Sequence, residues 1–367
     1  MPVAQLEVRL KNNPYLVSWF DEFNDIQSFV KANITRKAHG RQALITNNRL
    51  SKIYKKEIAS LFPGVHVISL PDGEGQKTLA TSEIICDTLV KLKFDRNAGL
   101  IAFGGGVIGD ITGFVAASYM RGIRFIQVPT SLLAMVDSSV GGKTGVNLKS
   151  GKNMVGAFHQ PGAVLIYLPF LKTLPAREYR CGLAEAYKSA LIKSKPFATY
   201  FQKNSSDIQN RNPESLFHLS YESVKIKNWV VQKDEKEKSL RAVLNLGHTL
   251  AHALESHLQY KKLKHGEAVA IGLSFAAYLS FKKKHLTRKE FEEIDETIKS
   301  LGLPRRIQAV ARGTSASRLV KLMQSDKKNA NDEIKFVLLD KPGRVRLAEP
   351  VGNKEIEIAL KEFLEFE

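Results

Sequence analysis

Residues 99–110 read GLIAFGGGVIGD, a short apolar run that leads into a glycine-rich turn. The run predicts a strand over 99–103, and the turn contains the pattern G-x-G-x-x-G before an expected helix. Glycines at these positions let the backbone approach a pyrophosphate, and a helix N-terminus offers N–H donors. No acidic residue follows about 20 residues later, so the stretch departs from the common dinucleotide fingerprint. We expect nucleotide binding by a variant geometry rather than a merely structural turn.

Apolar runs of similar length lie on both sides of this stretch. Further strands are expected over residues 42–46, 65–70, 125–128 and 164–168, with a helix over 50–62. This alternation is typical of a parallel α/β sheet, which binds ligands at the carboxyl ends of its strands. Two loops of that kind are at Asn47 and at residues 72–77.

The character of the chain changes near residue 178. Residues 173–175 read TLP, a helix and strand breaker, and beyond them the pattern is mostly helical. We therefore expect an α/β domain over residues 1–178 and a mainly helical domain over 179–367.

Charge and composition narrow the class of protein. Lys and Arg number 55 against 37 Asp and Glu, a net charge of +18 that suits an anionic substrate. The charges are scattered without a basic tail, which disfavours nucleic acid as a partner. Two cysteines suit a reducing cytosol, and the longest apolar run, residues 268–281, is too short for a bilayer. With no signal peptide recognisable at the N-terminus, we expect a cytoplasmic protein without membrane contact.

Residues 137–145, DSSVGGKTG, superficially resemble a phosphate loop. A Walker loop needs a glycine further upstream, where this chain has Ser or Asp, so we reject a nucleoside triphosphatase. We expect a flexible loop that presents Lys143, Lys149 and Lys152 beside Asn153 to phosphate or carboxylate groups. Ordinary exposed lysines would explain the loop equally well.

A second informative stretch is RAVLNLGHTLAHALE at residues 241–255, which we expect to be one helix. His248 and His252 are four residues apart and would share a face, with Asn245 and Arg241 on the turns before them. By itself this spacing favours two packed histidines over a site.

Other polar side chains of the second half are further candidates for a metal or substrate site. Glu185 and Lys188 would share another helix face, and His265 precedes an apolar helix. One glutamate and two histidines would make a zinc site with an open fourth position, although spacing does not choose among them. Zinc beside a nicotinamide would serve oxidation of a secondary alcohol.

Taken together, the motifs resemble those of 3-dehydroquinate synthases, a family of sugar-phosphate cyclases in the shikimate pathway of aromatic amino-acid biosynthesis. They occur in one order between about residues 40 and 340. The first half contributes DGEGQK (72–77), GGGVIGD (104–110), YMRG (119–122) and PTSLLAMVDSSVGGKTG (129–145). The second half contributes AEAYK (184–188), DEKE (234–237), LNLGHTLAHA (244–253), HGEAV (265–269) and DKK (326–328).

The resemblance implies a Rossmann-like NAD-binding domain, a helical metal-binding domain and an active site in the cleft between them. The metal, usually zinc and otherwise cobalt or another divalent ion, would bind Glu185, His248 and His265. NAD would contact Asn47, Asp72, Glu74, Lys77, Gly105, Gly106, Val107, Asp110, Thr130, Ser131, Lys143, Lys152, Phe170 and Thr173. The substrate would meet Asp137, Lys143, Lys152, Asn153, Lys188, Lys227, Arg241, Asn245, His252 and either Lys327 or Lys328. Arg121 would reach the partner's site in a homodimer.

The implied reaction converts 3-deoxy-D-arabino-heptulosonate 7-phosphate to 3-dehydroquinate and phosphate. NAD⁺ transiently oxidises C5, phosphate is eliminated, the ketone is reduced again, and an intramolecular aldol step closes the ring. His252 is the expected proton shuttle, which separates its role from that of His248. Two rivals are another cyclase of the same fold and a metal-dependent alcohol or glycerol-phosphate dehydrogenase, which would accumulate NADH.

Overall fold

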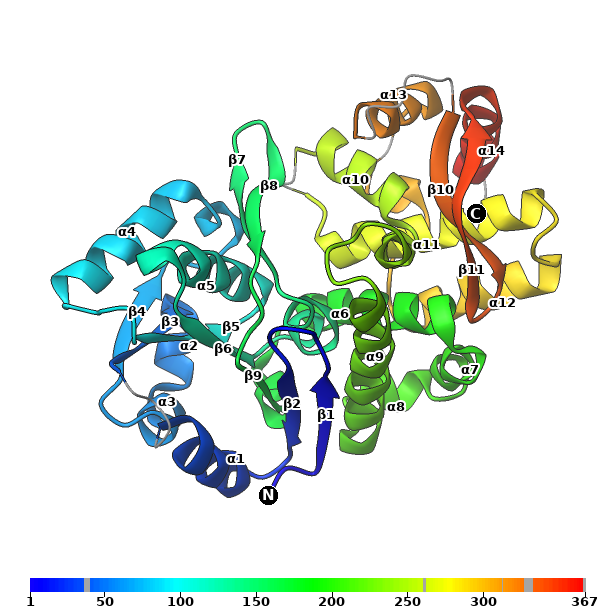
Figure 1. The fold of residues 1–367 in the computed structure, drawn as a ribbon. Coiled ribbons are helices and arrows are strands. Elements are labelled where there is room, and N and C mark those ends of the chain that lie inside the picture. The colour runs from blue at the N-terminus through cyan, green and yellow to red at the C-terminus, as the bar shows by residue number, and fades with distance from the viewer. Residues whose placement is uncertain (36–39, 260–261, 312, 327–332, 366–367) are drawn as a thin grey trace. The chain divides into compact units, whose positions relative to one another are not determined.

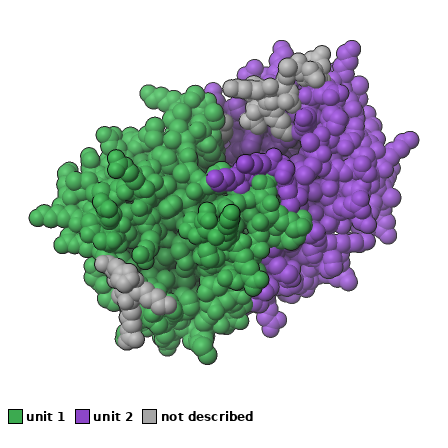
Figure 2. Space-filling model, in the orientation of Figure 1, with its two compact units in different colours: residues 1–174, 227–235 green, residues 175–226, 236–367 purple. Residues whose placement is uncertain are grey.

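The computed structural model describes residues 1–35, 40–259, 262–311, 313–326 and 333–365. The chain folds into two compact units (Figure 2). The first unit is residues 1–174 with 227–235, and the second unit is residues 175–226 with 236–367. We expected residues 227–235 in the helical domain, but they belong to the first unit. Lys227 Nζ lies 2.7 Å from Asp137 Oδ1, and the Asn228 amide donates to the Glu7 carbonyl at 3.0 Å. These contacts hold the end of α9 (Pro213–Lys233) against the first unit.

A seven-stranded sheet forms the first unit (Figure 1). In spatial order its strands are β1 (Ala4–Val8), β2 (Tyr15–Phe20), β9 (Ala163–Tyr167), β6 (Arg124–Pro129), β5 (Gly99–Gly104), β3 (Gln42–Asn47) and β4 (His66–Leu70). All neighbours pair in parallel except β1, which pairs antiparallel with β2. The predicted parallel α/β sheet is confirmed, with an antiparallel edge strand that was not expected.

Side chains of β5 alternate between the two faces of this sheet. Leu100 and Ala102 belong to a buried core shared with α4 (Leu79–Lys91) and α5 (Gly106–Ser118). Phe103 points the other way and packs edge-on against Tyr54 and Phe170, with ring centroids 5.8 and 5.2 Å away. Tyr54 also interrupts the helix predicted over 50–62, which is split into α2 (Asn48–Ile53) and α3 (Lys55–Leu61). The remaining helix of this region is α1 (Phe23–Val30).

The expected flexible loop after residue 137 is wrong. A short helical turn, η4 (Ala134–Ser138), leads into an antiparallel hairpin of β7 (Lys143–Leu148) and β8 (Gly151–Phe158). The hairpin is held by packing against α5, because Val146 is fully buried and a Cβ on Gly113 would lie 2.3 Å from Thr144 Cγ2. The Lys-Thr-Gly sequence is therefore strand, and it presents Lys143 on an ordered element.

Helices dominate the second unit, as predicted. They are α6 (Ala176–Lys193), α7 (Lys195–Lys203), α8 (Ser205–Gln209), the start of α9, η6 (Leu240–Asn245), α10 (His248–His257), α11 (His265–Lys282), α12 (Arg288–Ser300), α13 (Ala316–Asp326) and α14 (Asn353–Glu365). One hairpin, β10 (Glu333–Lys341) with β11 (Arg344–Gly352), pairs antiparallel. Helix α11 is buried along nearly its whole length, which makes it the core of the unit.

The single helix expected over residues 241–255 is wrong as well. The chain forms the 3₁₀ segment η6, turns at Gly247 with φ +79°, and begins α10 at His248. The turn allows close backbone contact with α11, since a Cβ on Gly272 would lie 1.9 Å from the Gly247 oxygen. His248 is thereby the first residue of a helix that touches α11.

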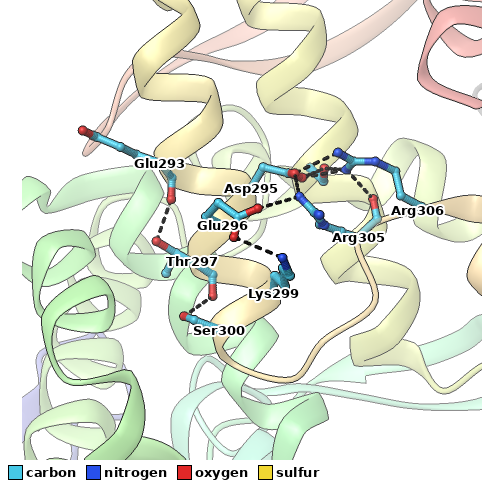
Figure 3. Close-up of polar contacts among 9 residues, drawn as sticks. Glu293, Asp295, Glu296, Thr297, Lys299, Ser300, Arg305 and Arg306 are labelled. Atoms are coloured by element: carbon cyan, nitrogen blue, oxygen red, sulfur yellow. Dashed lines mark hydrogen bonds and ion pairs between the residues drawn. The ribbon is translucent and has the colours of Figure 1, made fainter. Parts of the chain in front are cut away.

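A buried ionic network joins α11 to α12 (Figure 3). Asp295 accepts hydrogen bonds from Arg306 at 2.7 and 2.8 Å and from Ser274 at 2.5 Å, and Arg305 lies 2.5 Å away. Burial raises the pKa of Asp295, but the bonds from Arg306 and Ser274 outweigh it and hold that pKa below its usual range. The carboxylate is therefore charged and fully partnered inside the unit.

Within the described residues, no helix combines the length and the apolar character that crossing a membrane requires.

Candidate functional site

Residues expected to bind NAD gather at the carboxyl edge of the first unit's sheet. Strand β4 lies on one side of β3 and β5 on the other, so the chain reverses direction across the sheet between β3 and β5. Such a switch point is where open α/β sheets bind ligands. Asn47 ends β3 there and donates to Asp72 Oδ1 at 2.8 Å.

Helix α5 begins directly after β5, at the second glycine of the turn. Gly105 is its N-cap and Gly106 its first residue, so the backbone N–H groups of Gly106 and Val107 have no acceptor within the helix. A Cβ on Gly109 would lie 2.7 Å from Gln127 Oε1, so the absence of a side chain there lets the helix lie close to β6. The arrangement is the helix N-terminus to which phosphate groups bind.

Other expected NAD contacts surround this turn. Thr130 is buried and its N–H donates to the Gly104 carbonyl at 2.9 Å, while Ser131 Oγ lies beside Gly105. Tyr54 Oη bonds to the Phe170 carbonyl at 3.0 Å and to Thr173 Oγ1 at 2.5 Å. The segment η5 (Leu168–Thr173) is thus anchored by the tyrosine that lies between α2 and α3.

Polar side chains also link η2 (Glu74–Gln76) and its neighbour Lys77 to the hairpin. Lys77 Nζ lies 2.5 Å from Asp110 Oδ2 and 2.5 Å from Asn153 Oδ1. Burial raises the pKa of Asp110, and the Lys77 ammonium opposes that shift. A residue expected at the cofactor therefore touches one expected at the substrate.

The first unit also contains charged residues that are expected to bind the substrate. Lys143 begins β7, and Lys152 lies near the start of β8. Lys227, nearly buried, donates to the Asp137 carbonyl at 2.6 Å besides pairing with its carboxylate.

In the second unit three helices bring together the residues expected to bind a metal. The donor atoms of Glu185 (α6), His248 (α10) and His265 (α11) all lie within 4.8 Å of one another. Glu185 Oε1 is 3.2 Å from His265 Nε2 and 3.6 Å from His248 Nε2. Tetrahedral zinc keeps its donor atoms roughly 3.3 Å apart, so this set fits the ion.

The electrostatic surroundings of the two imidazoles also suit a cation. Burial, with the Lys188 ammonium next in effect, lowers the pKa of His248 to about 3, which keeps its ring neutral. Burial would lower the pKa of His265 too, but the Glu185 and Glu255 carboxylates outweigh it and raise the pKa to about 10. A positive charge is therefore favoured at His265, at the point where an ion would bind.

A further shell of contacts orients the two imidazoles. His248 Nδ1 is 3.1 Å from the Leu246 carbonyl and donates to it, which leaves Nε2 as the ligand atom. His265 Nδ1 lies 3.5 Å from Glu255 Oε1. Glu255 was not predicted from the sequence, although it belongs to residues 241–255. It lies seven residues after His248, a spacing of two helical turns.

Of the second unit's residues expected at the substrate, Lys188 and His252 contact members of this triad. Lys188 is buried, with Nζ 2.5 Å from Glu185 Oε2. His252 stacks edge-on against His248, with centroids 5.5 Å apart, and is not one of the three converging donors. Arg241 is buried in η6, and Asn245, at the end of the same segment, is exposed.

The remaining residues expected to bind the substrate are Arg121 and one of the two lysines at 327 and 328. Arg121 lies beyond the C-terminal end of α5, on η3 (Tyr119–Arg121), and is exposed. The helix places it about 20 Å from the glycine turn, at 1.5 Å per residue. Lys327 and Lys328 lie outside the described residues.

The family models and the relatives that match this sequence carry the same family description. Family models described as 3-dehydroquinate synthase N-terminal and C-terminal match residues 67–181 and 182–329. The 3-dehydroquinate synthase of Halorhodospira halophila is 45% identical over 303 residues, covering 83% of this chain and 84% of that protein. That of Dictyoglomus thermophilum is 40% identical over 363 residues, covering 98% of each. The solved structure of a 2-epi-5-epi-valiolone synthase from Streptomyces hygroscopicus subsp. jinggangensis 5008, with NAD⁺ and Zn²⁺ bound, has a TM-score of 0.86 at 26% identity and covers 97% of this chain and 98% of that chain.

Proposed function

The chain belongs to the 3-dehydroquinate synthase family, and we infer that it converts 3-deoxy-D-arabino-heptulosonate 7-phosphate to 3-dehydroquinate and phosphate. The observation that carries this inference is the converged Glu185, His248 and His265 triad in a chain with that family likeness. A site with two imidazoles and one carboxylate leaves a coordination position open for an oxygen of the substrate.

NAD and a divalent metal are the cofactors of this chemistry. When bound, NAD accepts and returns a hydride, and the metal polarises the substrate oxygen. NAD binding is supported by the glycine turn at the start of α5 and by the switch point between β3 and β5. Metal binding is supported by the spacing of the triad and by the neutral ring of His248.

We propose the following roles for the polar residues of the first unit. The Lys143 and Lys152 ammonium groups and the Asn153 amide bind the anionic substrate, since fixed cations on an ordered hairpin suit phosphate. Asp137 and Lys227 act as a pair, because each holds the other's charge at 2.7 Å.

In the second unit, we propose that Lys188, Arg241 and Asn245 orient the substrate and that a ring nitrogen of His252 transfers a proton. The separation of His252 from the triad supports a role distinct from that of His248. Glu255 would orient His265 as a carboxylate partner of its Nδ1, at 3.5 Å.

We also propose a cytoplasmic homodimer in which Arg121 serves the partner's site. The position of Arg121, exposed and remote from the glycine turn, supports a role outside its own chain's cofactor site. The free thiols of Cys86 and Cys181 support a reducing compartment.

The decisive experiment measures phosphate release and NADH together. Purified protein with zinc, a catalytic amount of NAD and the heptulosonate phosphate should release phosphate over many turnovers without net NADH. A chelator should stop the release, and added zinc should restore it. Accumulation of NADH in step with substrate consumption would instead identify a dehydrogenase and refute the inference.

A further inference from the structure

Asn147 is a half-buried residue of β7 whose side-chain amide is bonded on both sides. Its Nδ2 donates to Glu74 Oε1 at 2.8 Å, and its Oδ1 accepts from the Asn153 N–H at 2.9 Å. Its own N–H donates to the Lys77 carbonyl at 2.8 Å. One residue therefore connects the segment after β4 to the opposite strand of the hairpin.

Contacts of Lys77 complete a closed cycle of hydrogen-bonded residues, which we call the ring. Its Nζ contacts Asn153 Oδ1 and Asp110 Oδ2, each at 2.5 Å, and the side chain is almost fully buried. The ring runs from Glu74 through Asn147 and Asn153 to Lys77, and from there to Asp110 on α5. A movement of the 74–77 segment would therefore be felt at both the backbone and the side chain of Asn153.

The backbone of Asn153 makes this dependence stronger. Its φ is +55°, a left-handed conformation that residues other than glycine adopt at a cost. The bonds from Asn147 and Lys77 hold it there, because one fixes its N–H and the other its amide oxygen. Without them this conformation would be less favoured relative to the extended one that other residues of β8 adopt.

We propose that Asn147 is a positioning residue that couples the cofactor segment to the substrate-binding conformation of Asn153. The proposal rests on the proposed function and on the contacts that the family resemblance implies, in which Glu74, Lys77 and Asp110 contact NAD and Asn153 contacts the substrate. NAD that orders residues 74–77 would set Asn153 for the substrate. At binding equilibrium such coupling is reciprocal, so the substrate should in turn tighten NAD, which in steady state lowers the half-saturating NAD concentration.

A purely structural role for the Asn147 side chain is disfavoured by the way the hairpin is built. Val146 pairs with Val155 and Leu148 with Gly151 through the backbone, on either side of an irregularity at residue 147. Val146 supplies the buried contact with the core. The strands therefore stay paired when the Asn147 amide is removed.

The test compares wild type with Asn147→Ala and with Leu148→Ala, an exposed neighbour on the same strand outside the ring. The apparent affinity for NAD is measured in steady state at low and at saturating heptulosonate phosphate, and the ratio of the two is the coupling factor. We expect a wild-type factor of at least about 5, the lower end of ordinary coupling. It should fall to about 1 in Asn147→Ala, with a rise of roughly tenfold in the substrate KM, and stay unchanged in Leu148→Ala.

A wild-type factor of 1, or an Asn147→Ala factor within twofold of wild type, would overturn the proposal. A lower melting temperature with unchanged KM would also overturn it, because that is the signature of a merely structural residue. If Asn147→Ala does not fold, Asn147→Asp decides: it keeps the acceptor for the Asn153 N–H and sets a carboxylate against Glu74, so the coupling should still be lost. Absence of phosphate release by the wild type would instead contradict the proposed function itself.

Discussion

Gly266→Ala tests whether helix contact, rather than the ligands alone, builds the metal site. A Cβ at this position would lie 2.3 Å from Cys181 Cα and 2.4 Å from the Cys181 oxygen. Carbon atoms in contact are about 3.5–4.0 Å apart, so α6 and α11 must separate by roughly 1.2 Å or more. The clash is with backbone atoms, which no change of side-chain rotamer relieves.

That separation acts directly on the ligands. Glu185 lies one turn after Cys181 on α6, and His265 is the residue before Gly266, so both move with their helices. Metal–ligand distances tolerate shifts of only about 0.2 Å. The 3.2 Å between Glu185 Oε1 and His265 Nε2 would widen several times more than that. We expect zinc affinity to fall by 100-fold or more, with a stability loss of about 1–3 kcal/mol from overpacking.

The assay is a competition titration of metal-free protein with zinc and a chromophoric chelator, together with thermal unfolding. Gly352→Ala is the matched control, because no atom lies within 4 Å of its added Cβ and it belongs to the same unit. Wild-type zinc affinity in Gly266→Ala would refute the reasoning, as would an equal loss in the control.

Three further predictions concern the site and its support. His248→Ala should lose bound zinc by elemental analysis, whereas His252→Ala should keep it and turn over more slowly; equal metal loss in both would contradict their separate roles. Asp295→Asn should cost about 3–5 kcal/mol at pH 7, because it leaves the buried Arg306 and the half-buried Arg305 without their carboxylate. Since the folded pKa of Asp295 lies below its usual value, this difference should be complete above about pH 5 and vanish as pH falls through the folded pKa, which urea titrations at several pH values would show. Tyr54→Phe should weaken NAD binding about fivefold in calorimetry by releasing Thr173, and an unchanged affinity would argue against that anchor.

Much of the first unit could be predicted from local pattern. Strands expected over 42–46 and 99–103 end within one residue of β3 and β5, because buried parallel strands are short apolar runs bounded by turn residues. The hairpin after residue 137 could not be found in this way. Glycines in that region read as loop, whereas Gly145 and Gly156 are strand residues: a Cβ on Gly156 would lie 2.2 Å from the Thr144 oxygen.

The second unit shows the same limit. Nothing in residues 241–255 marks a break strongly, since one glycine within a helix is only mildly unfavourable. The cause of the break is Gly272, which lies far along the chain and meets Gly247 only in the folded unit.

Only some residues of the candidate site could be predicted from the sequence. Family likeness supplied Glu185, His248 and His265, because spacing cannot relate ligands on three separate helices. Glu255 and Asn147 could not be predicted from the sequence, because their roles depend on contacts made only in the folded chain. Glu255 faces His265 Nδ1, and Asn147 faces Glu74 Oε1. Residues that act through another residue carry no motif of their own.

The origin of the three ligands on α6, α10 and α11 has a consequence for how long the protein survives. A bound ion is a removable cross-link between three helices, one of which is the core of the second unit. Because the unfolded chain has no such site, free zinc at roughly a thousand times its Kd would add about 4 kcal/mol to folding. Starving cells of metal should therefore do more than silence the enzyme. It should also shift the second unit toward open forms that proteases cut, so that protein abundance falls with metal supply.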